Sequence, residues 1–179
     1  MAEPRTAFEL LLDIDQRCRT MAAGLPLQPA HQQDWVGIGF RLGAQRLVAP
    51  MNEIAEILPE PRYATMPGAK PWMLGVANLR GRLLPVMDLC GFFGRELSSA
   101  RKQRRVLVVE DQDVFAGLLV DEVFGVRHFS HLSLMPEALA GVDDPLAPFL
   151  RGQFLREQAW PVFSPFVLAR SPEFMDVAL

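Results

Sequence analysis

Residues 74–89 read LGVANLRGRLLPVMDL, and this stretch decides the fold. Residues on either side of Gly81 alternate with the period of two that is typical of β-strands, which predicts a hairpin. Glycine takes a positive φ without steric cost, so we place the turn at residues 80–82 and its positive φ at Gly81. Pro85 lacks an N–H and therefore indicates an edge or a bulge in the returning strand. Because arginines flank the glycine, we expect at least one guanidinium to project from this rigid turn.

The composition is that of an ordinary globular protein. The chain has 179 residues, half of them apolar and 22% charged, with a net charge of −3. Its apolar runs are far shorter than the roughly 20 residues that a membrane-spanning helix needs. No signal-peptide pattern precedes them, so we expect a cytoplasmic protein without membrane insertion. The negative charge argues weakly against binding to nucleic acid.

The cysteines and histidines do not form a site for a metal or a cofactor. Cys18 and Cys90 lie far apart in the sequence and in no metal-ligand spacing, so we interpret them as small apolar residues. His128 and His131 lie three positions apart, but no cysteine or acid completes a zinc set. We therefore expect no metal and no cofactor.

Two aspartates are the only candidates for catalysis. Asp88 and Asp121 each follow an apolar strand, and paired acids can perform acid–base chemistry. Nothing near them in the sequence supplies a nucleophile or an orienting histidine, and aspartates at strand ends commonly cap turns. We therefore expect a protein that is not an enzyme.

The rest of the chain predicts one helix followed by short strands. Apolar residues recur at spacings of three and four over residues 7–23, which favours an amphipathic helix that packs on the domain behind it or docks on a partner. Alternation then predicts strands at 35–42 and 46–51 and a last hairpin from 151–156 and 160–163. About ten short strands with frequent turns indicate an all-β fold.

The central hairpin resembles the signature of a known family. Residues 75–89 match, without a gap, the pattern of the CheW-like family, the adaptor domain of bacterial chemosensory arrays. Residues 47–58 and 117–126 resemble two further segments of that family. The resemblance implies an all-β fold of two SH3-like five-stranded β-barrels packed side by side, with the N-terminal helix as an addition.

The resemblance also implies a domain organisation. We expect an amphipathic helix and linker over residues 1–34. A CheW-like domain of two interleaved β-barrel subdomains follows over residues 35–170, and a tail over 171–179. The family usually ends its last strand with an aspartate; Ser164 stands near that position here, so we expect the strand to close differently.

The function implied by the resemblance is that of a non-catalytic signalling adaptor. Such an adaptor couples the cytoplasmic tip of a methyl-accepting chemoreceptor to the regulatory domain of a CheA-type histidine kinase. Other CheW-like adaptors are further expected partners, in membrane-associated arrays at the cell pole. The added helix and residues 89–94 resemble the adaptors of type IV pilus systems, which control twitching motility.

Arg80 is the first candidate for contact with a partner. A guanidinium on a rigid turn offers five fixed donors and suits carboxylate recognition. The alternative is an intramolecular pair with Glu56 or Asp88 that only fixes the turn. Matching the family motif adds a set of partner-binding candidates: Ile54, Glu56, Gly75, Val123 and Val126. Three of these, Ile54 and the two valines, are expected to line an apolar groove that accepts a helix, unless the valines are plain core.

A small-barrel RNA-binding module is the alternative function. Barrels of this kind bind RNA through stacked aromatic residues and basic grooves. The basic run at residues 101–105 has no interleaved aromatic residue, and the chain has one tyrosine. We therefore favour the adaptor and expect no nucleic acid partner.

Overall fold

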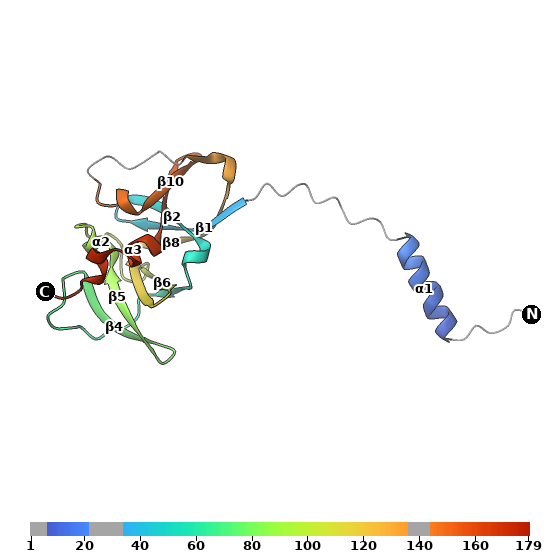
Figure 1. The fold of residues 1–179 in the computed structure, drawn as a ribbon, viewed down its shortest axis with the longest axis horizontal. Helices are drawn as coiled ribbons and strands as arrows, with labels where there is room; N and C mark the ends of the chain where they lie inside the picture. Colours follow the sequence, from blue (N-terminus) through green and yellow to red (C-terminus); the bar gives the residue numbers. More distant parts are fainter. Residues whose placement is uncertain (1–6, 22–33, 136–143) are drawn as a thin grey trace, which may run out of the picture. The chain divides into compact units, whose positions relative to one another are not determined.

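The computed structural model describes residues 7–21, 34–135 and 144–179 (Figure 1). The chain divides into two compact units, Met1–Gln32 and Gln33–Leu179. The first contains helix α1 (Ala7–Met21), which confirms the predicted helix up to the last described residue. Its apolar side chains, Phe8 and Leu11 among them, are exposed. The predicted uses of this helix, packing or docking, stay predictions.

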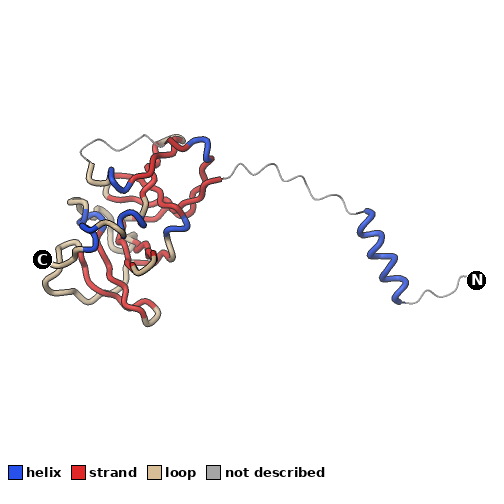
Figure 2. Tube along the Cα trace, in the orientation of Figure 1, coloured by secondary structure: helices blue, strands red, loops and turns tan. Residues whose placement is uncertain are grey.

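The second unit is built mainly from short strands (Figure 2). No helix in the described ranges is long and apolar enough to cross a membrane. The strands are β1 (Asp34–Leu42), β2 (Gln45–Pro50), β3 (Glu56–Pro59), β4 (Met73–Leu79), β5 (Arg82–Asp88), β6 (Arg105–Asp111), β7 (Val114–Val120), β8 (Glu122–Ser130), β9 (Leu134–Met135), β10 (Leu150–Leu155) and β11 (Ala159–Phe163). The helical turns are η1 (Met51–Glu53), α2 (Leu89–Phe92), η2 (His131–Ser133), η3 (Ala147–Phe149), α3 (Pro165–Ala169) and α4 (Pro172–Met175).

These strands form two sheets, which confirms the predicted fold class. The first sheet has the order β8-β1-β2-β11-β10-β9, with the two-residue β9 at its edge. The second sheet has the order β3-β6-β7-β5-β4. The second sheet uses strands from the middle of the domain, and the first sheet uses strands from before and after them. Each sheet contains one parallel pair, β2 with β11 and β5 with β7, and its other pairs are antiparallel.

Each sheet is covered on both faces. A central cluster lies between the sheets and takes residues such as Leu47 from β2 and Leu118 from β7. The neighbours Val48 and Leu119 point the other way, because successive side chains of a strand alternate between its faces. Val48 belongs to an aromatic cluster on the first sheet, which contains Val48, Phe129, Phe154, Trp160 and Val162. Leu119 belongs to an aliphatic cluster on the second sheet, which contains Ala77, Leu84, Val86, Val106, Val108 and Leu119.

The end of the last strand is closed by a serine. Ser164 is buried, and its Oγ accepts a hydrogen bond from the Val167 N–H at 3.3 Å, so it caps α3. The same hydroxyl donates to Glu53 Oε2 at 2.7 Å, and the N–H of Phe166 donates to that oxygen at 3.0 Å. A neutral residue is suited to this position because the carboxylate of Glu53 lies directly against it.

Candidate protein-binding site

The tip of the β4–β5 hairpin presents Arg80. Arg80 and Gly81 have φ values of 52° and 85°, the pattern of a two-residue type I′ turn. The expectation that positive φ falls at Gly81 alone is therefore wrong, since this turn requires it at both central residues. Asn78 Oδ1 accepts a hydrogen bond from the Gly81 N–H at 2.9 Å, which further holds the turn.

Arg80 forms an ion pair with Glu56, one of the two intramolecular pairs that the sequence leaves open. Arg80 Nη2 lies 2.7 Å from Glu56 Oε1, and 76% of the arginine side chain is exposed. Glu56 begins β3 and Arg80 follows β4, so the pair joins the two edge strands of the second sheet and shows that the sheet curls. An exposed pair contributes at most about 1 kcal/mol, and the guanidinium stays accessible.

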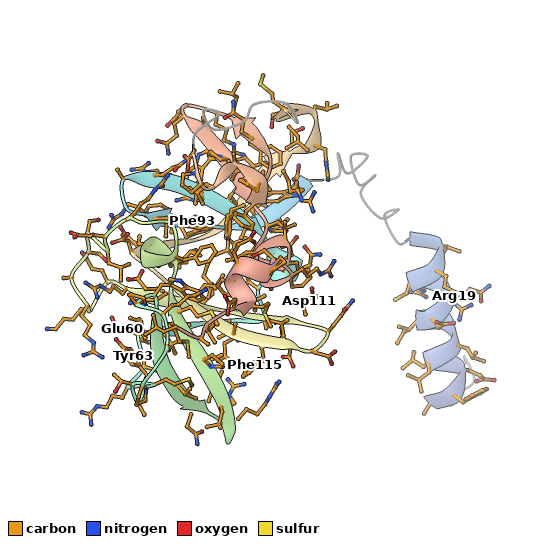
Figure 3. The ribbon with its side chains drawn as sticks, turned by 60° about the vertical axis from the view of Figure 1, so that its left-hand side comes forward. Arg19, Glu60, Tyr63, Phe93, Asp111 and Phe115 are labelled. Carbon is orange, nitrogen blue, oxygen red and sulfur yellow. The ribbon has the colours of Figure 1, made fainter. Side chains whose placement is uncertain are left out.

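A second arginine extends this surface. Arg82 Nη1 lies 3.0 Å from Glu110 Oε1, and its guanidinium carbon lies 3.9 Å from the ring centroid of Phe115, the residue that Figure 3 labels. Arg80 and Arg82 line one cavity of about 230 Å³ with their two glutamates and Phe115. Arg82, Glu110 and Phe115 are not among the residues predicted from the sequence. The two arginines that flank Gly81 could have indicated this surface from the sequence. The ring and the glutamate could not, because they come from β6 and β7, which only the folded chain brings close to Arg82.

The three apolar candidates lie in different environments. Ile54 and Val123 are both partly buried and pack against the central cluster. Val126 lies three residues further along β8 and is 47% exposed. The structure therefore brings Ile54 and Val123 to the same core, and Val126 is the one that offers surface. The apolar groove predicted from these residues stays a prediction.

Gly75 has a steric role in the structure. It is buried, its φ is 147°, and a Cβ atom at this position would lie 2.1 Å from the carbonyl oxygen of Ala64. The lack of a side chain lets Ala64 form a β-bridge with Val76, with N–O distances of 2.8 and 2.9 Å. The predicted role of Gly75 in partner binding stays a prediction.

The two aspartates considered for catalysis hold backbone groups. Asp88 Oδ1 accepts the Gly91 N–H at 3.0 Å and caps α2, and burial raises the pKa of Asp88. Asp121 is fully buried and accepts the N–H groups of Gly43, Ser98 and Ser99 at 2.6–2.7 Å. Burial acts to raise the pKa of Asp121, but these hydrogen bonds outweigh it and lower that pKa. Both carboxylates therefore serve the fold.

The thiol of Cys90 lies beside Asp121. Its Sγ is 3.5 Å from Asp121 Oδ2, and burial together with the nearby aspartate charge raises the pKa of Cys90 to about 12. Such a thiol stays protonated and unreactive at neutral pH. Within the described residues, no group of three histidines, cysteines or acids is placed to hold a metal ion.

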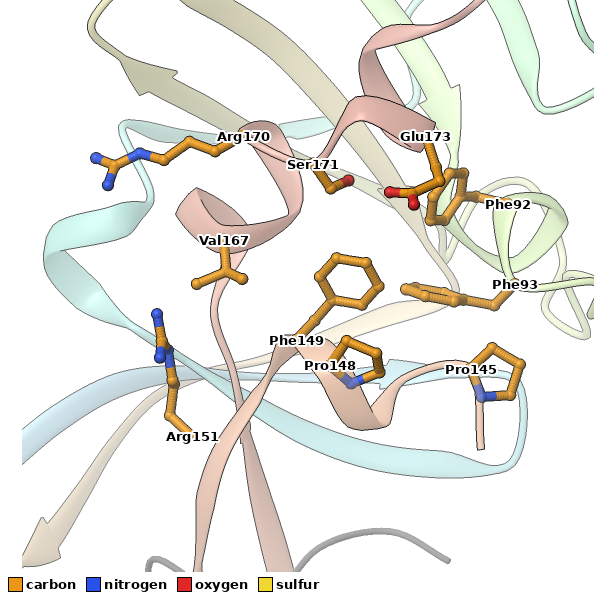
Figure 4. Close-up of a pocket in the computed structure, with 10 residues that line it drawn as sticks. All are labelled: Phe92, Phe93, Pro145, Pro148, Phe149, Arg151, Val167, Arg170, Ser171 and Glu173. Carbon is orange, nitrogen blue, oxygen red and sulfur yellow. The ribbon is translucent and has the colours of Figure 1, made fainter. Parts of the chain in front are cut away.

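A large apolar cavity lies away from the Arg80 turn. It has a volume of about 670 Å³ and is lined by Phe92, Phe93, Pro145, Pro148, Phe149, Arg151, Val167, Arg170, Ser171 and Glu173. Figure 4 shows the rings of Phe92, Phe93 and Phe149 on one side and the two arginines on the other. Arg170 is held by Asp111 through two hydrogen bonds of 2.6 and 3.0 Å. None of the residues that line this cavity was predicted from the sequence as a site residue.

Comparison with known proteins identifies relatives along the whole chain. Residues 36–173 match the family model of the CheW-like domain. The chain is 59% identical to the protein PilI of Pseudomonas aeruginosa over 179 residues, which is the full length of both. It is 32% identical to the chemotaxis protein CheW of Helicobacter pylori over 113 residues, covering 63% of this chain and 68% of that protein.

A solved structure shares the fold. The scaffolding protein TtCheW from Thermoanaerobacter tengcongensis superposes with a TM-score of 0.67 at 22% identity, covering 79% of this chain and 96% of that one. These comparisons confirm the family predicted from residues 75–89 and give no support to the RNA-binding alternative. The chain therefore belongs to the CheW-like family of chemosensory adaptors.

Proposed function

We propose that this adaptor couples the cytoplasmic tip of a methyl-accepting chemoreceptor to the regulatory domain of a CheA-type histidine kinase. In this proposal other CheW-like adaptors are additional partners in the same array. The coupling is non-catalytic. The hydrogen bonds of Asp88 and Asp121 to backbone N–H groups support that part of the proposal, because both carboxylates already have structural partners.

The observation that carries the proposal is the Arg80 turn. Its backbone is fixed by two successive positive φ values, while most of its guanidinium faces solvent. A fixed and accessible guanidinium suits recognition of a carboxylate on a partner, and Glu56 orients it from the side. Val126 is the exposed apolar residue of the predicted set and is assigned to the same function, on the first sheet.

The identity with PilI along the full chain supports a place in a type IV pilus system. We therefore assign the protein to the control of twitching motility, in cytoplasmic arrays beneath the membrane at the cell pole. A fluorescent fusion should form polar foci, and loss of the gene should abolish twitching. Diffuse fluorescence with normal twitching would contradict this assignment and leave the adaptor function in place.

Calorimetry with each isolated partner tests the coupling itself. The full chain is titrated with the regulatory domain of its kinase and, separately, with the receptor tip. We expect micromolar binding and a loss of about 2 kcal/mol, the size of an interface hot spot, for Arg80→Ala or Val126→Lys with at least one of them. Arg62→Ala is the matched control, because Arg62 is an exposed arginine that does not line the cavity at the hairpin tip. Absence of binding to both partners would overturn the proposal.

A further inference from the structure

A basic cleft lies on the first sheet. It has a volume of about 300 Å³, and its lining includes Arg46, Arg127 and Arg156 but only one acid, Glu157. The three arginines come from β2, from β8 and from the turn between β10 and β11. We call this site the arginine cleft. Three separate segments therefore converge to give it an excess of positive charge.

Each arginine of the cleft lies over an aromatic ring. The guanidinium carbons lie 5.3 Å from the ring centroid of Phe124 for Arg46, 5.5 Å from Trp160 for Arg127, and 5.1 Å from Phe129 for Arg156. These rings belong to the aromatic cluster or pack directly against it.

The rings form a rigid floor. Phe129 stacks on Phe154 at 4.5 Å, and Phe124 meets Trp160 edge-on at 6.1 Å. Guanidinium groups that pack on these rings have less conformational freedom in the unbound protein, so less is lost when a ligand binds.

The guanidinium groups of the cleft have no carboxylate partner in the described part of the chain. No ion pair within 4.0 Å involves Arg46, Arg127 or Arg156 there, whereas Arg80 and Arg82 each have a glutamate. Arg156 donates a hydrogen bond to the carbonyl oxygen of His128, which leaves its other donors available. The cleft therefore combines fixed donors with uncompensated charge.

We propose that the arginine cleft binds a short acidic segment of a partner protein, with two or more carboxylates close together in its sequence. Guanidinium groups bind carboxylates through paired, charge-assisted hydrogen bonds. Three arginines against one glutamate match a segment of two charges, and the volume accommodates a few side chains. The chain as a whole carries −3, which disfavours a long polyanion such as RNA or an anionic membrane. This site does not depend on the Arg80 turn.

Fluorescence anisotropy with a defined peptide tests the proposal. The probe is a fluorescein-labelled peptide with a run of glutamates, and the control peptide has glutamines in their place. We expect the full chain to bind the glutamate peptide and not the glutamine peptide. Arg127→Gln and Arg156→Gln should each weaken binding about tenfold, the effect of one charge-assisted hydrogen bond. Arg62→Gln removes an equal charge elsewhere and should leave binding unchanged.

Several outcomes would overturn the proposal. Equal binding of both peptides, or affinity unchanged in Arg127→Gln and Arg156→Gln, would mean that the arginines only cover the aromatic cluster. Tighter binding of a single-stranded oligonucleotide or of phosphatidylglycerol vesicles at the same arginines would assign the cleft to a phosphate ligand instead. Near-ultraviolet circular dichroism of each variant checks that the rings stay packed. Arg80→Ala should keep full peptide affinity, so failure here is separable from failure of the receptor and kinase coupling.

Discussion

In the second sheet, Arg80 and Arg82 lie 2.7 and 3.0 Å from glutamate oxygens, whereas in the first sheet Arg46 and Arg127 lie over aromatic rings. The arginines differ in their carboxylate partners and not in their rings, because Arg82 also lies 3.9 Å from the ring centroid of Phe115. The second sheet covers an aliphatic cluster, and the first sheet covers an aromatic one. An aromatic face carries partial negative charge and holds a cation without neutralising it.

The comparison separates two kinds of surface on one domain. A paired arginine can contact a partner only by sharing or replacing its glutamate, which favours recognition of a specific geometry. An arginine that lies on a ring and has no glutamate partner keeps its full charge for an incoming carboxylate. We infer that the hairpin tip recognises the geometry of a partner surface, whereas the arginine cleft recognises its negative charge.

The largest expected effect comes from a methyl group placed in the second sheet. In Gly75→Ala the new Cβ meets the backbone of Ala64 at 2.1 Å, at a φ of 147° that alanine avoids, so we expect a loss of more than about 4 kcal/mol. Urea unfolding measures it. In the first sheet, Gly39→Ala meets the flexible Arg127 side chain at 3.1 Å and the Trp160 ring at 3.2 Å, and should cost about 1 kcal/mol. Equal costs would contradict this contrast.

The second largest effect on stability is expected at Asp121, which lies between β7 of the second sheet and β8 of the first. Asp121→Asn replaces an acceptor of three backbone N–H groups by an amide that must present one NH₂ to them. We expect a loss of about 2–4 kcal/mol at neutral pH in urea unfolding. Asp88→Asn is the control and should cost much less, because Asp88 is an acid whose charge is disfavoured by burial.

The two substitutions should change the pH dependence of the free energy of unfolding in opposite directions. The pKa of Asp121 is lowered in the folded state, so its stabilising contribution is present above the ordinary aspartate pKa of about 4 and disappears as the pH falls below it. The pKa of Asp88 is raised, so its ionisation destabilises the fold as the pH rises through that pKa. Asp121→Asn should therefore flatten the acid limb of stability, and Asp88→Asn should steepen it. The same slope in both variants would contradict these assignments.

A smaller effect compares one arginine from each sheet. Arg82→Gln loses the ion pair with Glu110 and the contact with Phe115, so we expect a destabilisation of about 1 kcal/mol. Arg127→Gln loses only a ring contact and should cost about 0.5 kcal/mol. Thermal melting at low and high salt measures both. The cost of Arg82→Gln should fall with added salt, and an equal fall for Arg127→Gln would indicate an ion pair there.

The smallest effect on stability is expected at Arg80. Arg80→Gln should change the free energy of unfolding by less than about 0.5 kcal/mol, because the pair with Glu56 is largely exposed. The same denaturation experiment measures it beside Arg82→Gln. A cost above that of Arg82→Gln would mean that the hairpin tip depends on Arg80 for its fold.

Local structure was predictable from the sequence where a residue type fixes the backbone. The hairpin around Gly81 and the last hairpin, now β10 and β11, follow from alternation and turn residues, and the structure confirms them. The left-handed φ of Arg80 was missed because arginine rarely adopts it, and the demand comes from the twist of the paired strands.

Long-range pairing explains what the sequence did not predict. Asp121 takes its donors from Gly43, Ser98 and Ser99, which only the folded chain brings together. Arg127 meets Trp160 for the same reason, from a different strand of the sheet. A period of two identifies a strand and its faces, but not the strand beside it.

In the sequence, all strands of the second sheet lie between two groups of strands of the first sheet. This order has a consequence during synthesis. Val162 pairs with Val48, more than one hundred positions earlier, so β2 lacks that neighbour until the end of the domain has been made. At a ribosomal rate of about 5–20 residues per second, this strand waits roughly 5–25 seconds. The hairpins of the second sheet are complete well before then and can fold first. We therefore expect the nascent chain to carry an open strand edge, which chaperones can bind, until β11 has been synthesised.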